Sequence, residues 1–301
     1  MNNLTNIISP KDAQQLIAQL IRPKNNPLGD EEWDSIPEIN IVEQVILGTF
    51  RPCASKNGST CYCPLTKEVI YRRLAVIDSL FSTNAGMGYF ILQDMTEAIW
   101  EECLDANGYH TDAELVRKAE DYIRQCLNPA ANVSQHPIKQ KLLDIKFGYN
   151  ASTLKPQQEY SLLTKYLHYL LEAADSQIGF PIIDSLVPDL THYFVKHSPA
   201  KPTNISFPQY VRALDRIGNT WQVQGYAGWS RFHVLDRLLW TIAKINQAAN
   251  KTTKPITCDM KKIHILLSKS EFQAVVVGNG TLPPQHPIIY IHQHIIPQLP
   301  K

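Results

Sequence analysis

The apolar residues of this chain recur at helical spacing through most of its length, and this recurrence limits the fold more than any other feature. Between residues 65 and 81, for example, Ile70, Leu74 and Ile77 fall on one face of a helix. Similar patterns follow one another from about residue 64 to 250, joined by short polar turns, without a β-rich run among them. The pattern predicts an all-α fold, a two-lobed helical bundle.

Short helix signals mark several of the expected helices. Ser9 and Pro10 begin one that runs to about Ile21, because proline is tolerated in a first helical turn. Thr111, with Glu114 three residues later, predicts a capping box at the start of another helix. Further helices are expected over the following ranges: 41–47, 65–81, 92–104, 111–127, 136–147, 156–174, 181–195, 207–217 and 232–249.

The last fifty residues differ in composition from the rest. Residues 262–267 and 271–277 are rich in β-branched residues, and 288–296 alternates in part. We therefore expect two or three short strands packed on the helical body. This divides the chain into an N-terminal helix with loops (1–63), a helical core domain (64–250) and a β-containing C-terminal extension (251–301).

Charge and hydropathy exclude some classes of protein. Hydrophobic residues make up 44% of the chain, enough for a folded core, and the formal net charge of +1 does not indicate a nucleic-acid binder by itself. The sequence has neither the apolar run of roughly 20 residues that crosses a bilayer nor a secretion signal at its start. We expect a cytoplasmic protein without a membrane partner. The sequence does not fix an oligomeric state.

Two groups of residues carry potential metal ligands. Cys53, Cys61 and Cys63 lie in one loop, but three thiols without the paired spacing of a zinc knuckle favour free thiols over a zinc site. His292 and His294, two residues apart, would face the same side of a strand, where a polar exposed face is favoured over a metal site. No metal is expected, and zinc at the cysteines stays open as an alternative.

The segment 161–195 contains the best candidates for chemistry. Along its first helix Lys165 belongs to a polar stripe at 3.6-residue spacing, opposite a broad leucine and tyrosine face. The stripe either faces water or lines a cleft. Asp184 follows an extended proline turn, where capping of the next helix alone would explain an aspartate.

A lysine followed nineteen residues later by an aspartate just past a proline resembles the helix-hairpin-helix DNA glycosylase superfamily. The lysine-using 8-oxoguanine glycosylase/lyases are the most similar branch. Their Pro-Val-Asp-x-His-Val motif is matched by Pro181-Ile182-Ile183-Asp184-Ser185-Leu186-Val187, with one extra residue. The family's Leu-Pro-Gly-Val-Gly hairpin is replaced by residues 152–165, which contain no glycine.

The resemblance implies a DNA base-excision glycosylase, with or without AP-lyase activity, that acts on a flipped base in double-stranded DNA without a cofactor. Lys165 would be the nucleophile and Asp184 the carboxylate that stabilises positive charge at C1′. The expected base pocket consists of Tyr166, Tyr169, Phe180, Trp229 and Phe232. The expected DNA contacts are Asn84, Arg72, Arg73, Arg231 and Arg237.

Each of these residues also has an ordinary structural explanation. Aromatic side chains at such spacing belong more often to a core, and single arginines more often to a solvated helix face. The alternative function is therefore a non-enzymatic helical module that binds a protein or a nucleic acid.

Overall fold

The computed structural model describes residues 7–26, 30–51, 65–81, 88–155, 158–184, 186–194, 206–252 and 256–299. The chain separates into two compact units, one formed by Val45–Asp184 and the other by Met1–Gln44 together with Ser185–Lys301. Among the described residues, no helix is both long enough and apolar enough to cross a membrane.

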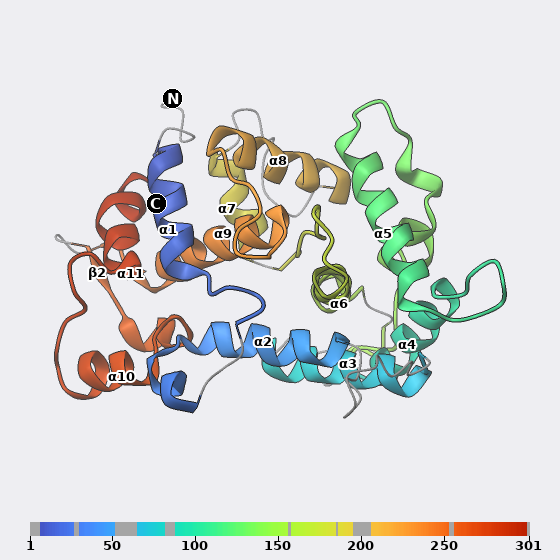
Figure 1. Cartoon of the computed structure of the whole chain (residues 1–301), viewed down its shortest axis with the longest axis horizontal. Helices are drawn as coiled ribbons and strands as arrows, with labels where there is room; N and C mark the ends of the chain where they lie inside the picture. The colour runs from blue at the N-terminus through green and yellow to red at the C-terminus, as the bar shows by residue number, and fades with distance from the viewer. Residues whose placement is uncertain are drawn as a thin grey trace. The chain divides into compact units, whose positions relative to one another are not determined.

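The unit Val45–Asp184 is built around one central helix, α6, which packs against α3, α5 and η5 (Figure 1). Helix α3 also packs along α4, and both contribute fully buried aliphatic side chains to the core. The elements are the end of α2 (Glu38–Phe50), α3 (Lys67–Phe81), α4 (Ile91–Glu102), α5 (Asp112–Leu127), η4 (Val133–Gln135), the π-helix η5 (Ile138–Leu143) and α6 (Tyr160–Ala173).

Local sequence determines where α5 begins. Thr111 has extended backbone and its side chain accepts a hydrogen bond from the amide of Glu114, as expected for an N-cap. The Glu114 carboxylate is directed to Arg117, with two N–O distances of 2.7 and 2.9 Å. The cap is therefore confirmed, while the acidic member of the expected capping box forms an ion pair on the helix surface.

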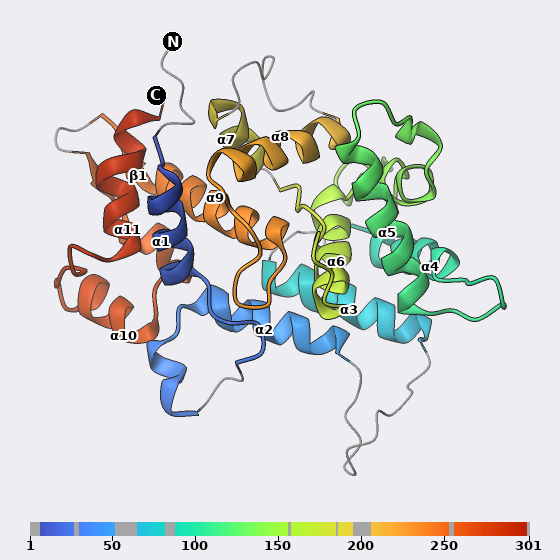
Figure 2. The ribbon, with the colours of Figure 1, turned by 45° about the horizontal axis from the view of Figure 1, so that its top comes forward.

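The other unit is organised around α9, which packs against α1, α7, α8, η7 and η9. Figure 2 shows α1 beside α11 in this unit. Its elements are α1 (Pro10–Leu20), η2 (Asp30–Ser35), the start of α2, α7 (Val187–Phe194), α8 (Phe207–Thr220), α9 (Arg231–Ala248), β1 (Ala249–Asn250), β2 (Thr257–Cys258), η7 (Met260–Leu266), α10 (Lys269–Phe272), η8 (Gln273–Val277), α11 (Pro287–Tyr290), η9 (Ile291–Ile295) and η10 (Ile296–Gln298).

The described structure is mostly helical, with one small antiparallel sheet near the C-terminus, so the expected all-α fold with a short β-containing tail is confirmed. The strands lie elsewhere than expected, however. In the sheet Ala249 pairs with Cys258 and Asn250 with Thr257. The three segments expected as strands, 262–267, 271–277 and 288–296, are helical.

The physical reason for this difference is visible in the same segments. A capping box between Ser268 and Glu271 begins α10. The buried residues Ile288, Ile291 and Ile295 recur at helical spacing, which outweighs their β propensity once they pack against the core.

The division of the chain also differs from the three consecutive segments 1–63, 64–250 and 251–301. Helix α1 buries Ala13, Leu16 and Ile17 and packs on α9, and the C-terminal helix η9 packs on the same helix. Residues from both ends of the sequence therefore share one core. The boundary near residue 185 falls within the segment that was expected to be a single helical core.

Candidate active site on helix α6

Helix α6 carries the polar stripe that contains Lys165, and the structure places that stripe in the interior. Thr164, Lys165, His168 and Glu172 expose at most 6% of their surface. Of the two interpretations left open by the sequence, a solvated face is therefore excluded. Buried polar groups require hydrogen-bond partners, so the contacts of these side chains determine what the helix is able to do.

The contacts of Lys165 include a hydrogen bond and an aromatic contact within the same unit. Its Nζ donates a hydrogen bond of 2.7 Å to Oγ of Ser161, one turn earlier on α6. It also lies 5.0 Å from the ring centroid of Phe81, at the end of α3. The Phe81 ring is in turn stacked on Tyr169, with a centroid distance of 6.2 Å. The amine thus lies between a hydroxyl of its own helix and a ring of α3.

His168 lies one turn after Thr164 and fixes the next segment of chain. Its Nδ1 is 2.6 Å from the carbonyl oxygen of Phe180, so Nδ1 carries the proton and Nε2 is the basic nitrogen. Burial lowers the pKa of His168 to about 4, which makes the imidazole neutral at pH 7. A ring nitrogen of His168 and a carboxylate oxygen of Glu172 lie within 4.8 Å of one another.

A second hydrogen bond joins the same segment to α6. The amide of Ile183 donates to Oγ1 of Thr164 at 3.0 Å, while that hydroxyl donates to the carbonyl of Tyr160 at 2.6 Å. Phe180 is bonded to His168, and Ile183, further along the chain, is bonded to Thr164, one turn earlier on α6. The segment therefore runs antiparallel to the helix. Lys165 is the residue after Thr164, and the half-buried Asp184 is the residue after Ile183. The hydrogen bond between Ile183 and Thr164 is therefore one residue away from both.

The helix that was expected to begin at Pro181 begins later. Residues 181–184 have no regular secondary structure, and α7 begins at Val187 rather than at Pro181. The carbonyl of Phe180 and the amide of Ile183 are hydrogen-bonded to side chains of α6. These two backbone groups therefore do not need the hydrogen bonds of a helix of their own.

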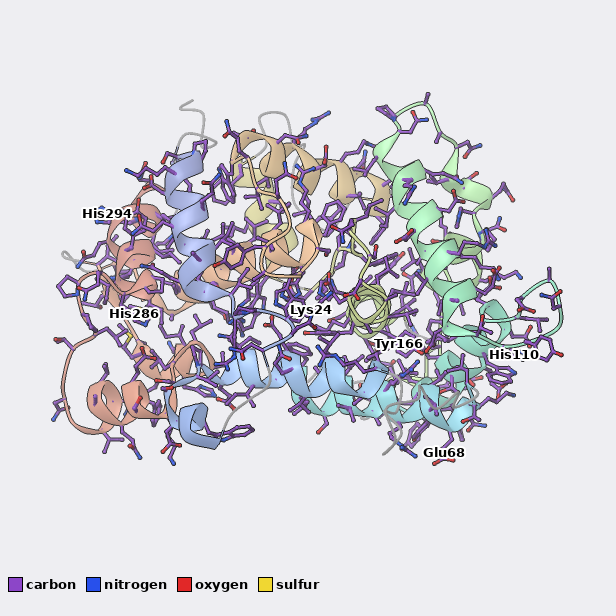
Figure 3. The ribbon with its side chains drawn as sticks, in the orientation of Figure 1. Lys24, Glu68, His110, Tyr166, His286 and His294 are labelled. Atoms are coloured by element: carbon purple, nitrogen blue, oxygen red, sulfur yellow. The ribbon has the colours of Figure 1, made fainter. Side chains whose placement is uncertain are left out.

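Tyr166 and Arg73 form a separate buried network in this unit. Arg73 makes a bidentate ion pair with Asp112 at 2.8 and 2.9 Å and donates to the carbonyl of Thr49 at 3.2 Å. Its Nη1 lies 3.5 Å from the Tyr166 hydroxyl, and its guanidinium lies over the Phe50 ring. Burial is the largest single influence and opposes the charge of Arg73, but the hydrogen bonds and charges of Asp112 and Tyr166 together outweigh it and raise the pKa of Arg73. Figure 3 labels Tyr166 on α6 and Glu68 on α3.

The expected base-pocket residues are all buried. Tyr166, Tyr169 and Phe180 belong to the unit Val45–Asp184 and expose no more than 1% of their surface. Trp229 and Phe232 belong to the other unit and are each 3% exposed. Tyr166 and Tyr169 lie on α6 and Phe180 is bonded to it through its carbonyl oxygen, whereas Trp229 and Phe232 belong to the core of the other unit.

The expected DNA contacts occupy different environments. Arg72 is exposed and pairs with Glu68 at 2.8 Å, whereas Arg73 is buried as described above. In the other unit Arg231 pairs with Asp215 at 2.8 Å. Arg237 is 3% exposed, its Nη1 is 3.9 Å from the Glu43 carboxylate, and its Nη2 donates to Asn40 at 3.3 Å. Asn84 lies outside the described residues.

Of the two groups of potential metal ligands named from the sequence, the histidine pair is the one that lies within the described residues. Cys53, Cys61 and Cys63 lie outside the described residues. His292 and His294 lie on the π-helix η9 rather than on a strand, so the expectation of a shared strand face is wrong.

Comparison of the chain with protein-family models, with curated proteins and with solved structures yields no match. The sequence pointed to Lys165 and Asp184 but not to Phe81, because no local pattern indicates which ring from another helix will meet a lysine. The hydroxyl of Thr164 was part of the predicted stripe, yet its bond to Ile183 depends on the return of the chain after α6.

Proposed function

We propose that this protein is a DNA base-excision glycosylase that also cleaves the strand as an AP lyase, with Lys165 and Asp184 as its reacting groups. The observation that carries the proposal is the hydrogen bond between Ile183 and Thr164. It holds the backbone next to the carboxylate against the backbone next to the amine, although the two residues are far apart in sequence.

The position of Lys165 favours attack by its amine on a bound sugar. Lys165 exposes 6% of its surface, and its amine has to lose a proton to present the lone pair that attack on a sugar carbon requires. The hydrogen bond to Ser161 and the Phe81 ring restrict the side chain to one orientation. An orientated, partly desolvated lysine is the arrangement that an imine-forming enzyme needs.

Asp184 supplies the second requirement of the reaction. As the bond between C1′ and the base breaks, its electron pair leaves with the base, which takes up a proton, and positive charge develops on C1′ and the ring oxygen. A carboxylate close to C1′ stabilises this charge. Asp184 is half-buried, so its charge would be screened less than that of a fully solvated aspartate.

The lyase step follows from the same amine. The Lys165 nitrogen forms a bond to C1′ and loses a proton, and the sugar ring then opens with O4′ protonated, which leaves an iminium ion. Loss of a proton from C2′ expels the 3′-phosphate and breaks the strand. Hydride from borohydride reduces the iminium to a secondary amine, so the intermediate is trapped as a stable cross-link.

The test is borohydride trapping with two labelled duplexes, one containing 8-oxoguanine and one containing an abasic site. We expect a cross-linked product with the natural protein and none with Lys165→Gln, which keeps a polar side chain beside Ser161. Asp184→Asn should slow base release by about 100-fold, as the loss of one charge-stabilising group does in other enzymes.

Lys146→Gln is the matched control, because Lys146 is an exposed lysine of the same unit. It should cross-link as the natural protein does, and circular dichroism should show equal helicity in all variants. A cross-link that persists in Lys165→Gln, or no cross-link with either duplex, rejects the proposal.

One observation favours a different function, a non-enzymatic helical module that binds protein or nucleic acid. Arg73 and Arg237, two of the cations assigned to phosphate contacts, are buried and engaged by Asp112 and by Asn40 and Glu43. Binding of an undamaged duplex with no cross-link to any lesion would support this alternative.

A further inference from the structure

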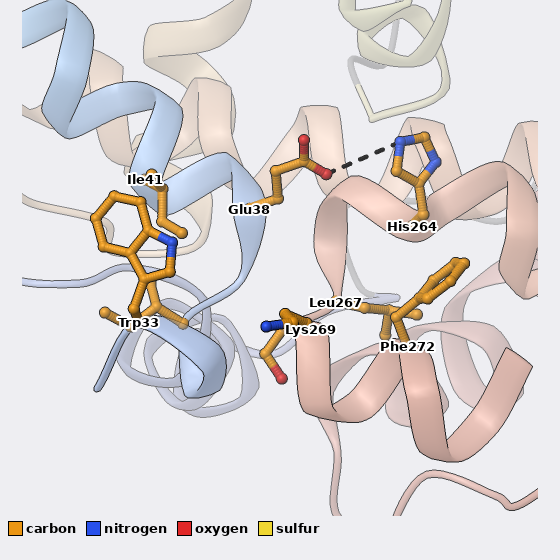
Figure 4. Close-up of a pocket in the computed structure, with 9 residues that line it drawn as sticks. Trp33, Glu38, Ile41, His264, Leu267, Lys269 and Phe272 are labelled. Atoms are coloured by element: carbon orange, nitrogen blue, oxygen red, sulfur yellow. Dashed lines mark ion pairs between the residues drawn. The ribbon is translucent and has the colours of Figure 1, made fainter. Parts of the chain in front are cut away.

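A pocket of about 320 Å³ lies in the unit formed by residues 1–44 and 185–301, and it has no part in the chemistry proposed for Lys165. It is formed by η2, the first turn of α2, the end of η7 and α10 (Figure 4). This volume falls within the range of pockets that bind small molecules. The residues that line it include Trp33, Glu38, Ile41, His264, Leu267 and Phe272.

The two walls of this pocket come from opposite ends of the sequence and are tied together. Lys269 pairs with both carboxylate oxygens of Asp34, at 3.0 and 3.1 Å. The amide of Glu38 donates to the carbonyl of Leu267 at 3.2 Å. Because a capping box also fixes the start of α10, the pocket is held open by its own framework and does not need a ligand to form.

The lining combines aromatic and aliphatic surfaces with an excess of negative charge at the mouth. Trp33 exposes 46% of its surface. An exposed aromatic side chain of this size is available to contact a ligand. Among the lining residues and their ion-pair partners, the carboxylates of Asp34 and Glu38 outnumber the one ammonium, that of Lys269. Figure 4 shows Trp33 on one wall, Leu267 and Phe272 on the other, and Glu38 between them.

We propose that this pocket binds an organic cation with a flat apolar body. The apolar body would contact Trp33, Ile41 and Leu267, and the charged group would lie near the Glu38 carboxylate. Trp33, 46% exposed, offers an indole as the apolar wall for this body, and an indole also attracts a nearby cation. Asp34 is already engaged by Lys269, whereas the ion pair that the described residues give Glu38 is the looser one with His264, 3.9 Å away.

The carboxylates of Asp34 and Glu38 favour a cation over an anion or a neutral molecule of the same size. An anion would meet an excess of carboxylate, and a neutral aromatic would gain nothing from Glu38. The cation belongs either to a free amine or to a basic side chain of a peptide, since both present the same chemistry to a pocket this small.

The experiment is a calorimetric and tryptophan-fluorescence titration of the full chain with 2-phenylethylamine, 2-phenylethanol and 3-phenylpropionate, which differ mainly in charge. We expect saturable binding of the amine, about tenfold tighter than binding of the alcohol, and no binding of the carboxylate. An acetylated, amidated Phe-Arg dipeptide forms the second arm, and tighter binding of this probe would identify a peptide as the source.

Glu38→Gln should weaken amine binding about tenfold and Trp33→Ala should abolish it. Glu68→Gln removes the same charge from another exposed helix position and should leave binding unchanged. Both test side chains are exposed, so circular dichroism is expected to show intact folding. Equal binding of amine and carboxylate, no saturable binding, or an unchanged affinity in Glu38→Gln would overturn the proposal.

Discussion

The amide of Ile183 donates a 3.0 Å hydrogen bond to the hydroxyl of Thr164, nineteen residues earlier in the chain. Thr164 is completely buried, so neither water nor a nearby side chain is a simple substitute for this acceptor. The bond fixes the segment that leads to Asp184 on the helix that carries Lys165, and the arrangement of the candidate site depends on it.

Thr164→Val keeps the shape of the side chain and removes the acceptor. We expect a loss of about 1–3 kcal/mol in the free energy of unfolding, because a buried amide is left without a partner. The amide of Ile183 should also exchange its hydrogen faster, which hydrogen exchange followed by mass spectrometry measures. Thr164→Ser, which retains the hydroxyl, is the control. Unaltered exchange at Ile183 in the valine variant would contradict the role assigned to this bond.

His168 makes stability depend on pH. Its pKa is lowered by burial to about 4 in the folded state, against an ordinary value of 6.5, so the unfolded chain binds a proton more readily. This contribution to stability is present above pH 6.5 and is lost as the pH falls through 4. We expect a loss of up to about 3 kcal/mol over this interval.

Urea unfolding from pH 7 to pH 4 measures this effect. The free energy of unfolding should fall less in His168→Gln than in the natural protein, and the difference should equal the loss assigned to His168. His294→Gln, which replaces an exposed histidine, should lose as much as the natural protein. Parallel curves for the natural protein and His168→Gln would show that the imidazole is not held neutral.

Glu102 forms ion pairs with Lys118 and Lys141, and we expect the two lysines to contribute unequally to the free energy of unfolding. Its carboxylate is 1% exposed and lies 3.2 Å from Nζ of Lys118 and 2.9 Å from Nζ of Lys141. Lys118 is 18% exposed and also donates to the Glu102 carbonyl at 2.8 Å, whereas Lys141 is 63% exposed. Water therefore screens the second pair much more than the first.

We expect Lys118→Met to lower the free energy of unfolding by about 3 kcal/mol, because it removes the main partner of a buried charge. Lys141→Met should cost no more than about 1 kcal/mol. Chemical denaturation of the two variants in parallel checks the order. A larger loss for Lys141→Met would mean that Glu102 is stabilised chiefly from the solvent side.

Glu271 gives a second pH dependence, at lower pH. The hydrogen bond from His286 at 3.1 Å, together with the bonds to Ser268, lowers the pKa of Glu271 to about 2 although burial acts in the opposite direction. A carboxylate with a lowered pKa contributes stability above its ordinary pKa, and this contribution disappears as the pH falls through about 2.

Glu271→Gln keeps the capping box but removes the charge. The substitution should lower the free energy of unfolding by about 1–2 kcal/mol at pH 6. This difference in stability from the natural protein should shrink as the pH falls from 4.5 to 2. Thermal unfolding of both proteins over this interval measures the difference. A difference that stays constant down to pH 2 would show that the charge has no stabilising role.

Much of the helical fold was predictable because helix signals are local. Ser9 and Pro10 start α1 where expected, Thr111 caps α5, and the apolar spacing of residues 65–81 gives α3 within two residues. The C-terminal helices were mistaken for strands. Their β-branched residues favoured strands, while the cap at Ser268 and the spacing of Ile288, Ile291 and Ile295 favoured helices.

The sequence by itself determined that the chain is helical, that Lys165 belongs to a polar stripe and that an aspartate follows a proline turn after it, because each depends on residues close together along the chain. Only the tertiary structure decided that the stripe is buried, that Phe81 covers Lys165 and that Thr164 holds Ile183. The same applies to the pocket at Trp33, whose walls come from both ends of the sequence. Such contacts arise from packing between distant segments, and their energies depend on burial and partners that no local pattern encodes.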